Sequence, residues 1–473
     1  MKKNSLLAIF FALFILNPVF GQAPKYIFYL IGDGMGVNHV NLTEIYTADL
    51  NGKIGYQPLQ FTLFPYATMA STNSLSHGIT DSAAGGTALA VGKKTKNGVI
   101  GMDSTATKPL KSVAYAAKEK GLKVGITTSV SIDHATPASF YAHQADRNMY
   151  YEIAKDLIQS NFDFFAGSGF LSPTKTFDKK EAPSIFPQFE KAGYTLLKGK
   201  DAYAKHPKKA GKLILINEDG KDNSSLPFAI DQDNKEMRLA DITNAAIESL
   251  SKDNSNGFFL MVEGGKIDWS SHANDGATTI REVLDFNESV KIAYEFYKKH
   301  PNETLIVVTA DHETGGLGIG TGSSRLYTKN IANQKGSVGA LPLKIRNLRE
   351  NNQNATWDDV KNLLNENLGL FSTIKISKED EQAIFESFEK SFVNHENETE
   401  KSLYAIDDRI ATLAVAALNK ASSIAWASKN HSAAYVPVYA IGVGAELFNK
   451  KWIILIFQKI LRKLLDLTFR IIP

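Results

Sequence analysis

Three uninterrupted apolar segments most strongly constrain how this chain can fold. They span residues 25–31, 257–262 and 304–310, and they are rich in β-branched and aromatic side chains. A strand that is buried on both faces has this continuous pattern, whereas a strand with one solvated face alternates apolar and polar residues. Residues 238–251 and 277–299 predict helices on either side of the second segment. The chain is therefore expected to be an α/β protein with a large, mostly parallel, mixed central sheet and helices on both faces.

Weaker signals extend this alternation along the chain. Further strands are expected at 123–128, 162–166, 213–216 and 436–441, and further helices at 109–120 and 146–159. The region from Gly315 to Lys429 differs, because it opens with Gly, Ser and Asn and continues as polar helices, such as 356–366 and 378–392. We interpret it as an excursion from the core, and expect one domain at 22–448 with a helical and irregular insertion at about 316–430.

The first residues predict export. Lys2 and Lys3 precede a short apolar stretch, and Val19 and Gly21 place small residues at a cleavage site, so residues 1–21 have the pattern of a signal peptide. The chain has no cysteine, which excludes a lipoprotein anchor, a cysteine nucleophile and a structural zinc finger. Without the two lysines of the leader and the net +5 of residues 449–473, the formal charge of +3 becomes −4. We therefore expect a periplasmic or secreted protein with no nucleic-acid partner and no stable membrane anchor.

One serine lies in an unusual setting. Residues 79–92 surround Ser82 with small side chains, and Asp81 and Ser82 are good helix starters. A serine at a helix start lies where the helix dipole favours a bound anion. The alternative is a capped and tightly packed core helix without a function.

Chemically active residues follow several predicted strands. Because sites in open α/β sheets form beyond the carboxyl ends of strands, we expect these residues to meet at one edge. They are Asp33, His134, Thr136, Glu263, Asp268, His272, Asp311, His312 and His431. Their carboxylates and imidazoles are the mixture that zinc accepts, while Glu263 and Thr136 offer the oxygen atoms that suit magnesium. His39, His77 and His143 are interpreted as structural. Lys266 is interpreted as a surface charge, with the steering of anions as the alternative.

Five motifs resemble the alkaline phosphatase family in order and spacing. They are Gly32–Gly36, Thr80–Ala84, His134–Ala138, Val262–Asp268 and Thr309–Glu313. The resemblance runs from about Lys25 to Phe448 and implies the family's fold, with a crown-like insertion. It also implies an exported phosphate monoester hydrolase that acts on small substrates, uses two Zn²⁺ and one Mg²⁺, and forms a homodimer.

The resemblance also implies individual roles. Ser82 would be the nucleophile that becomes phosphoserine, and Arg147 would clamp the phosphate. The remaining assignments are Asp33, Asp311 and His312 for the zinc that activates the serine, Asp268, His272 and His431 for the second zinc, and Asp33, Thr136 and Glu263 for magnesium. His134 and Trp269 depart from some family members at positions that surround the metals and the phosphate. The alternatives are a phosphodiesterase or sulfatase on the same fold, and a non-catalytic secreted phosphate-binding protein.

The final segment, 449–473, changes abruptly in composition. It holds six basic residues against one acidic residue, together with an apolar run from Trp452 to Phe457. Such a segment is typical of a surface that lies on a membrane. However, permitted codons for residues 452–459 encode, in the neighbouring frame, a polar string that resembles the usual family continuation. Our hypothesis is that 449–473 is an aberrant tail produced by a frameshift, which should pack poorly on the core and carry no site residue.

Overall fold

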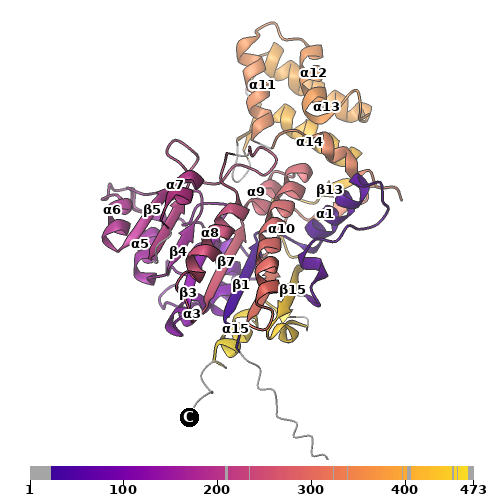
Figure 1. The fold of residues 1–473 in the computed structure, drawn as a ribbon. Coiled ribbons are helices and arrows are strands. Elements are labelled where there is room, and N and C mark those ends of the chain that lie inside the picture. Colours follow the sequence, from indigo (N-terminus) through magenta and orange to yellow (C-terminus); the bar gives the residue numbers. More distant parts are fainter. Residues whose placement is uncertain are drawn as a thin grey trace, which may run out of the picture.

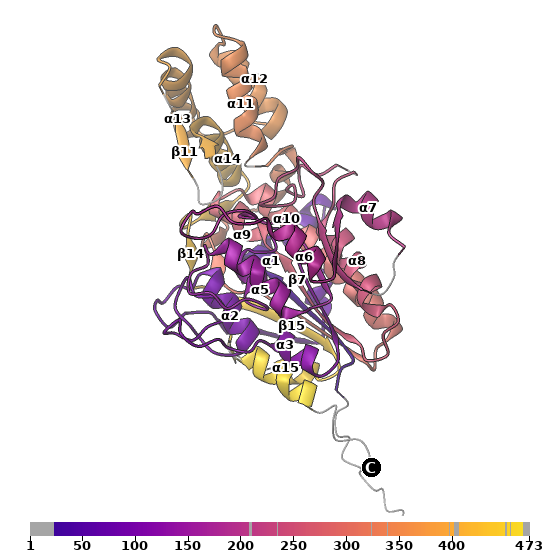
Figure 2. The same ribbon diagram turned by 90° about the vertical axis from the view of Figure 1, so that its left-hand side faces the viewer.

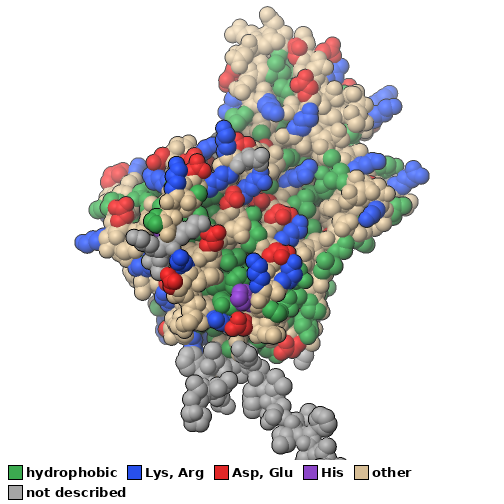
Figure 3. All heavy atoms as spheres, viewed as in Figure 1, with side chains coloured by type: hydrophobic (Ala, Val, Ile, Leu, Met, Phe, Trp, Pro, Cys, Tyr) green, Lys and Arg blue, Asp and Glu red, His purple; other side chains and the backbone are tan. Residues whose placement is uncertain are grey.

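The structure is a computed structural model that describes residues 23–466, apart from 208–210, 234, 323, 338, 397, 402–405, 450–451 and 455. The predicted leader therefore lies outside the described residues. Within them, every helix is too short or too polar to span a lipid bilayer. On the face of the molecule in Figure 3, acidic and basic side chains are interspersed.

A ten-stranded sheet forms the centre of the molecule (Figure 1), in the order β16-β2-β15-β8-β1-β7-β3-β4-β6-β5. Its strands are β1 (Tyr26–Gly32), β2 (Tyr66–Ser71), β3 (Lys123–Thr128), β4 (Phe164–Ala166), β5 (Tyr194–Lys198), β6 (Lys212–Ile216), β7 (Phe258–Gly264), β8 (Thr304–Thr309), β15 (Val436–Gly442) and β16 (Trp452–Ile453). All neighbours are parallel except β15, which runs antiparallel to both β8 and β2. The predicted mixed and mostly parallel sheet is confirmed.

Helices cover both faces of this sheet. The helices of this part of the chain are α1 (Val37–Leu50), α2 (Ser82–Val91), α3 (Val113–Glu119), α4 (Ala135–Ala138), α5 (Tyr150–Ser160), α6 (Ile185–Lys191), α7 (Gly199–Lys205), α8 (Leu239–Ser251), α9 (Lys266–His272) and α10 (Gly276–Lys299). On one face, Phe28 and Phe258 pack against Phe296 of α10, while their strand neighbours Tyr29 and Phe259 contact Phe140 after α4. Adjacent residues of a strand point to opposite faces, so both faces are covered by apolar side chains.

The chain between β8 and β15 leaves the sheet and builds helices that rise above one end of it (Figures 1 and 2). Its elements are β9 (Glu313–Thr314), β10 (Leu317–Ile319), α11 (Ala340–Asn351), α12 (Trp357–Leu368), α13 (Lys378–Phe388), β11 (Thr399–Lys401), β12 (Ile406–Asp408), α14 (Arg409–Ala421), β13 (Ile424–Trp426) and β14 (His431–Ser432). Side chains such as Ile345, Leu364, Ile384 and Leu418 form an apolar cluster there, separate from the main core. The two short strands β9 and β14 return the chain to the sheet edge, where they pair.

The described part of residues 449–473 contradicts the expectation that this tail packs poorly. β16 pairs with β2, and α15 (Ile456–Asp466) lies against α2 and α3 (Figure 2). Ile454, Leu461 and Leu465 are buried, and the side chain of Gln458 fills the space beside Gly92. The expectation was wrong because the apolar side chains of α15 cover a matching apolar surface. A frameshift origin of the tail stays a prediction.

Candidate active site

Four neighbouring parallel strands, β3, β7, β1 and β8, end at the same edge of the sheet. Glu263 in β7 pairs with Ile31 in β1, so these two strands end level with each other. Asp33 follows β1 directly, and Asp311 follows β8 after one residue. Thr136 lies in α4, shortly after β3. The strand order thus explains why oxygen ligands that are distant in the sequence lie close together.

Ser82 is the first residue of α2 and is completely buried. Asp81 caps this helix, because its carboxylate accepts a hydrogen bond from a backbone N–H of the first turn at 3.0 Å. A side chain on Gly85 would meet the carbonyl oxygen of Asp311 at 2.9 Å, so glycine allows α2 to approach the end of β8. As a result, Ser82 Oγ lies 3.2 Å from His312 Nε2.

Asp33, Asp311 and His312 form a first ligand group with completely buried side chains. His312 Nε2 lies 3.3 Å from Asp33 Oδ1 and 3.5 Å from Asp311 Oδ2. Donor atoms around a tetrahedral zinc, with bonds of about 2.0–2.1 Å, lie roughly 3.3 Å apart. The distances from His312 Nε2 to the two carboxylates therefore fit neighbouring donors around one zinc ion, and Ser82 Oγ lies beside the same nitrogen.

Asp268, His272 and His431 form a second ligand group. One turn of α9 separates Asp268 from His272, whereas His431 comes from β14. The two Nε2 atoms lie 3.1 Å apart, and they lie 3.3 Å and 3.5 Å from Asp268 Oδ1. The two Nδ1 atoms face the carbonyls of Lys429 and Thr80. A carbonyl only accepts, so each Nδ1 donates and each Nε2 keeps its lone pair for a metal.

Asp33 also belongs to a third ligand group, with His134 and Glu263. Thr136 Oγ1 lies 3.3 Å from Asp33 Oδ2, which adds a hydroxyl to this group. Among the described residues, the buried oxygens Asp33 Oδ1, Glu263 Oε1 and Asp268 Oδ2 accept no hydrogen bond. Buried polar atoms rarely lack a partner. A bound cation would supply the missing partner of each of these three oxygens. The oxygen donors of the third group suit magnesium.

Burial and mutual repulsion disturb the titration of these groups. Burial, with the charge of Asp311 second, raises the pKa of Asp33 well above its usual range. Burial and the charge of Asp268 raise the pKa of Asp311 to about 7, and burial raises the pKa of Glu263 to about 8. Burial also lowers the pKa of His312 well below its usual range. Several buried carboxylates so close together repel one another when ionised, and a bound cation would relieve this repulsion.

Arg147 lies beside the serine. Its NH1 atom is 3.2 Å from Asp81 Oδ2, and its NH2 atom is 3.4 Å from His134 Nε2. Burial, followed by the charge of Arg147, lowers the pKa of His134 to about 3, so this imidazole is neutral. The ring of Trp269 lies edge-on to His134, with 6.1 Å between ring centroids. The structure thus brings Arg147, His134 and Trp269 together next to the residue that precedes Ser82.

Thr314, which no sequence pattern singled out, connects the first and second ligand groups. Its Oγ1 donates to Asp268 Oδ1 and lies 3.3 Å from His312 Nδ1. Although burial acts to raise the pKa of Asp268, His272 and His431 hold it well below its usual range. Since the ionised Asp268 can only accept, the oxygen of Thr314 accepts the Nδ1–H of His312. His312 Nε2 then faces the first ligand group without a proton.

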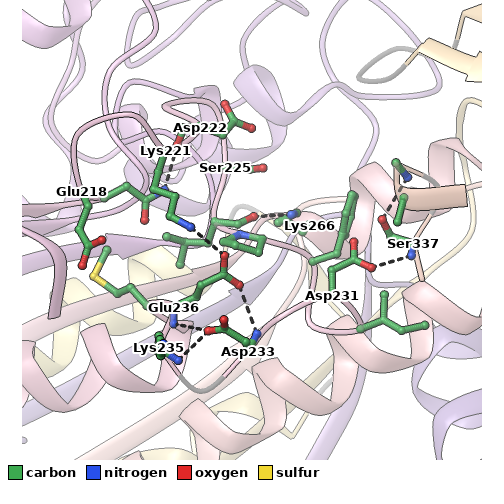
Figure 4. A pocket seen from close by; sticks show the side chains of 18 of the residues that line it. Glu218, Lys221, Asp222, Ser225, Asp231, Asp233, Lys235, Glu236, Lys266 and Ser337 are labelled. Atoms are coloured by element: carbon green, nitrogen blue, oxygen red, sulfur yellow. Dashed lines mark hydrogen bonds and ion pairs between the residues drawn. The ribbon is translucent and has the colours of Figure 1, made fainter. Parts of the chain in front are cut away.

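A cavity of about 1060 Å³ lies away from these groups, between residues 217–237, Lys266 and the start of α11 (Figure 4). Lys266 was expected to be a surface charge, but it is buried. Its Nζ atom donates to the carbonyl of Leu226 and lies 3.5 Å from the centroid of the Phe228 ring. Burial lowers its pKa to about 8. The expectation was wrong because a loop from a distant part of the sequence covers this side chain.

Comparison with known proteins agrees with this geometry. The family model for alkaline phosphatase matches residues 24–166 and 174–452. The chain therefore belongs to the alkaline phosphatase family. This membership makes it an enzyme, a hydrolase of phosphate monoesters. The match ends at residue 452, so α15 lies beyond it.

Individual relatives cover most of the chain. Alkaline phosphatase 4 of Bacillus subtilis (strain 168) is 32% identical over 432 residues, which span 89% of this chain and 84% of that protein. The crystal structure of a cold-active alkaline phosphatase from the psychrophile Shewanella sp. is 26% identical and superimposes with a TM-score of 0.77, over 93% of this chain and 99% of that one. A mutant of the TAB5 alkaline phosphatase, with Mg bound in the M3 site, is 27% identical with a TM-score of 0.63, over 94% and 99%.

Proposed function

We propose that this enzyme is exported and that it hydrolyses phosphate monoesters through a phosphoserine at Ser82, with two Zn²⁺ and one Mg²⁺. The observation that carries the proposal is the position of Ser82 Oγ, 3.2 Å from His312 Nε2 of the first ligand group. His431 of the second group lies nearby, because its Nδ1 is 2.9 Å from the carbonyl oxygen of Thr80. The first and second ligand groups would each hold a zinc ion and the third a magnesium ion. When bound, the metals supply a lower pKa for the serine hydroxyl and charge neutralisation at the phosphate oxygens.

Residues of the chain itself would attack the phosphorus atom and bind the phosphate. Ser82 supplies the oxygen that attacks phosphorus, and the N-terminus of α2 provides partial positive charge where the phosphate approaches. Asp81 orients the guanidinium of Arg147 by its 3.2 Å ion pair, and this planar group would bind two non-reacting phosphate oxygens. Neutral His134 and Trp269 would line the space around the bound phosphate.

Other parts of the proposal rest on sequence and relatives. The pattern at residues 1–21 supports export to the periplasm or the medium. The relative with Mg bound in its M3 site supports magnesium in the third ligand group. Family membership supports a homodimer, and the helices between β8 and β15 support a catalytic domain at 22–448 with a crown-like insertion at about 316–430.

The test is to trap the covalent intermediate. Enzyme loaded with zinc and magnesium is mixed with a ³²P-labelled monoester and quenched in acid, and the labelled peptide is sequenced. The label should lie on Ser82, and Ser82→Ala should bind zinc normally but lose almost all turnover. Ser255→Ala, at an exposed serine, is the matched control. A label on another residue, or a faster reaction with a phosphodiester or a sulfate ester, would contradict the proposal.

A further inference from the structure

Glu313 is a buried carboxylate close to the ligand groups, yet it belongs to none of them. It is the first residue of β9, directly after His312, and its exposed fraction is 3%. One carboxylate oxygen accepts the backbone N–H of Leu317 at 3.1 Å. The other accepts the N–H of Gly316 at 3.1 Å and the hydroxyl of Ser432. Each carboxylate oxygen thus faces a backbone N–H, so the site suits a side chain with two acceptor oxygens.

These contacts join segments that carry different metal ligands. Ser432 is the neighbour of His431 and pairs with Glu313 across the short β9–β14 ladder. Gly36 belongs to the loop that carries Asp33, and a side chain at Gly36 would come within 2.2 Å of the Cγ of Glu313. The side chain of Glu313 thus lies between the loop after β1, the segment after β8, and the strand that carries His431.

His39 lies near Glu313 but forms no ion pair with its carboxylate. His39 Nδ1 lies 3.9 Å from Glu313 Oε1. However, the same Nδ1 accepts the backbone N–H of Gly36 at 3.2 Å, and Nε2 lies 3.1 Å from Ser271 Oγ. A ring nitrogen that accepts carries no proton, so His39 is neutral. The carboxylate of Glu313 is therefore held by its three hydrogen bonds.

We propose that Glu313 is a positioning residue that fixes the spacing between the first and second ligand groups. His431 is the only member of the second group that is not on α9, and its strand has just two residues. The hydrogen bond from Ser432 to Glu313 holds this strand against the segment that carries Asp311 and His312. The inference rests on the proposed function for its metals, but it concerns how tightly the second group binds zinc.

The test measures zinc binding by the purified apo-protein, with no reliance on activity. Glu313→Gln keeps the shape of the side chain but replaces one acceptor oxygen with an amide N–H₂, which cannot accept the backbone N–H of Gly316 or Leu317. Loss of an interaction that orients a ligand typically weakens metal binding by about 10–100-fold. We expect that loss for one of the two zinc ions, with a smaller change for the other, because His312 and Asp311 remain anchored by β8. Glu295→Gln, at an exposed glutamate of α10, is the matched control.

Ser432 supplies a second, gentler test. Ser432→Ala should reproduce the selective weakening, and Ser432→Thr, which keeps the hydroxyl, should restore it. If Glu313→Gln fails to fold, this pair of variants still decides the matter. Equal zinc affinity in wild type, Ser432→Ala and Ser432→Thr would overturn the inference, as would equal weakening of both zinc ions. Wild-type protein that binds two zinc ions but forms no phosphoserine would instead contradict the proposed function alone.

Discussion

Thr314→Val offers a direct way to separate the orientation of the metal ligands from folding. Valine has the branched shape of threonine but lacks the hydroxyl, and Thr314 is completely buried. The substitution removes the donor to Asp268 Oδ1 and the acceptor for His312 Nδ1 in one step. Asp268 then keeps its contacts with His272 and His431, whereas His312 loses the bond that fixes which nitrogen faces the first ligand group.

The expected magnitude follows from these two contacts. Losing a group that orients a metal ligand typically costs about 10–100-fold in metal affinity. At about 1.4 kcal/mol per factor of ten, this is roughly 1.4–2.8 kcal/mol. A buried polar group left without its partner costs about 1–3 kcal/mol, which agrees with that range. Because Thr314 touches a member of each zinc-like group, both zinc ions should be weakened, in contrast to Glu313→Gln.

The assay is a competition between the apo-protein and a chromophoric zinc chelator, followed by activity at saturating zinc. Thr314→Val should need about 10–100-fold more zinc for half-occupancy and should regain most activity when zinc is in excess. Thr314→Ser keeps the hydroxyl and should bind zinc nearly as the wild type does. Zinc affinity of Thr314→Val within twofold of wild type, or equal defects in the Ser and Val variants, would refute the reasoning.

Three further predictions concern the phosphate, the buried carboxyl groups and the tail. Arg147→Ala should weaken inhibition by inorganic phosphate together with kcat/KM, and unchanged phosphate inhibition would contradict a clamp at Arg147. The pKa values of Asp311 and Glu263 are raised to about 7 and 8, so these two carboxyl groups increasingly destabilise the metal-free fold as pH rises from 5 to 8. Thermal unfolding should therefore show a widening gap between metal-free and metal-loaded protein over this interval, and a constant gap would count against these shifts. Leu461→Ala should lower the free energy of unfolding, measured in urea, by about 2–5 kcal/mol, because Leu461 is fully buried. Lys459→Ala, at an exposed position of the same helix, should change it little. Equal effects of the two variants would show that α15 does not pack as described.

Elements whose pattern is set by burial on both faces could be predicted from the sequence. The strands β1, β7 and β8 are continuous apolar runs, and the predicted ranges at 257–262 and 304–310 agree with them within two residues. β2 was missed because it lies near the sheet edge, and its burial alternates along a short strand that contains Ala, Thr and Ser. α1 was missed because polar and apolar residues are mixed around its surface, so no single face marks it.

The candidate ligands were found because they follow strands, whereas the residues that orient them were not. Asp33, Glu263 and Asp311 stand at predicted strand ends, where topology alone brings them together. Thr314 and Glu313 lie in a two-residue strand whose partner, β14, begins at His431. Such a pairing is invisible to local periodicity, because it depends on where the chain returns after more than a hundred residues.

The position of β1 at the centre of the sheet has a consequence for the order of folding. β1 is made first, but its neighbours β7 and β8 begin at Phe258 and Thr304. Contacts between residues so far apart in sequence form slowly, because the entropic cost of closing a long loop comes before the contacts stabilise the chain. His431 arrives later still, just before β15 completes this part of the sheet. A chain that stops before His431 therefore lacks one member of the second ligand group.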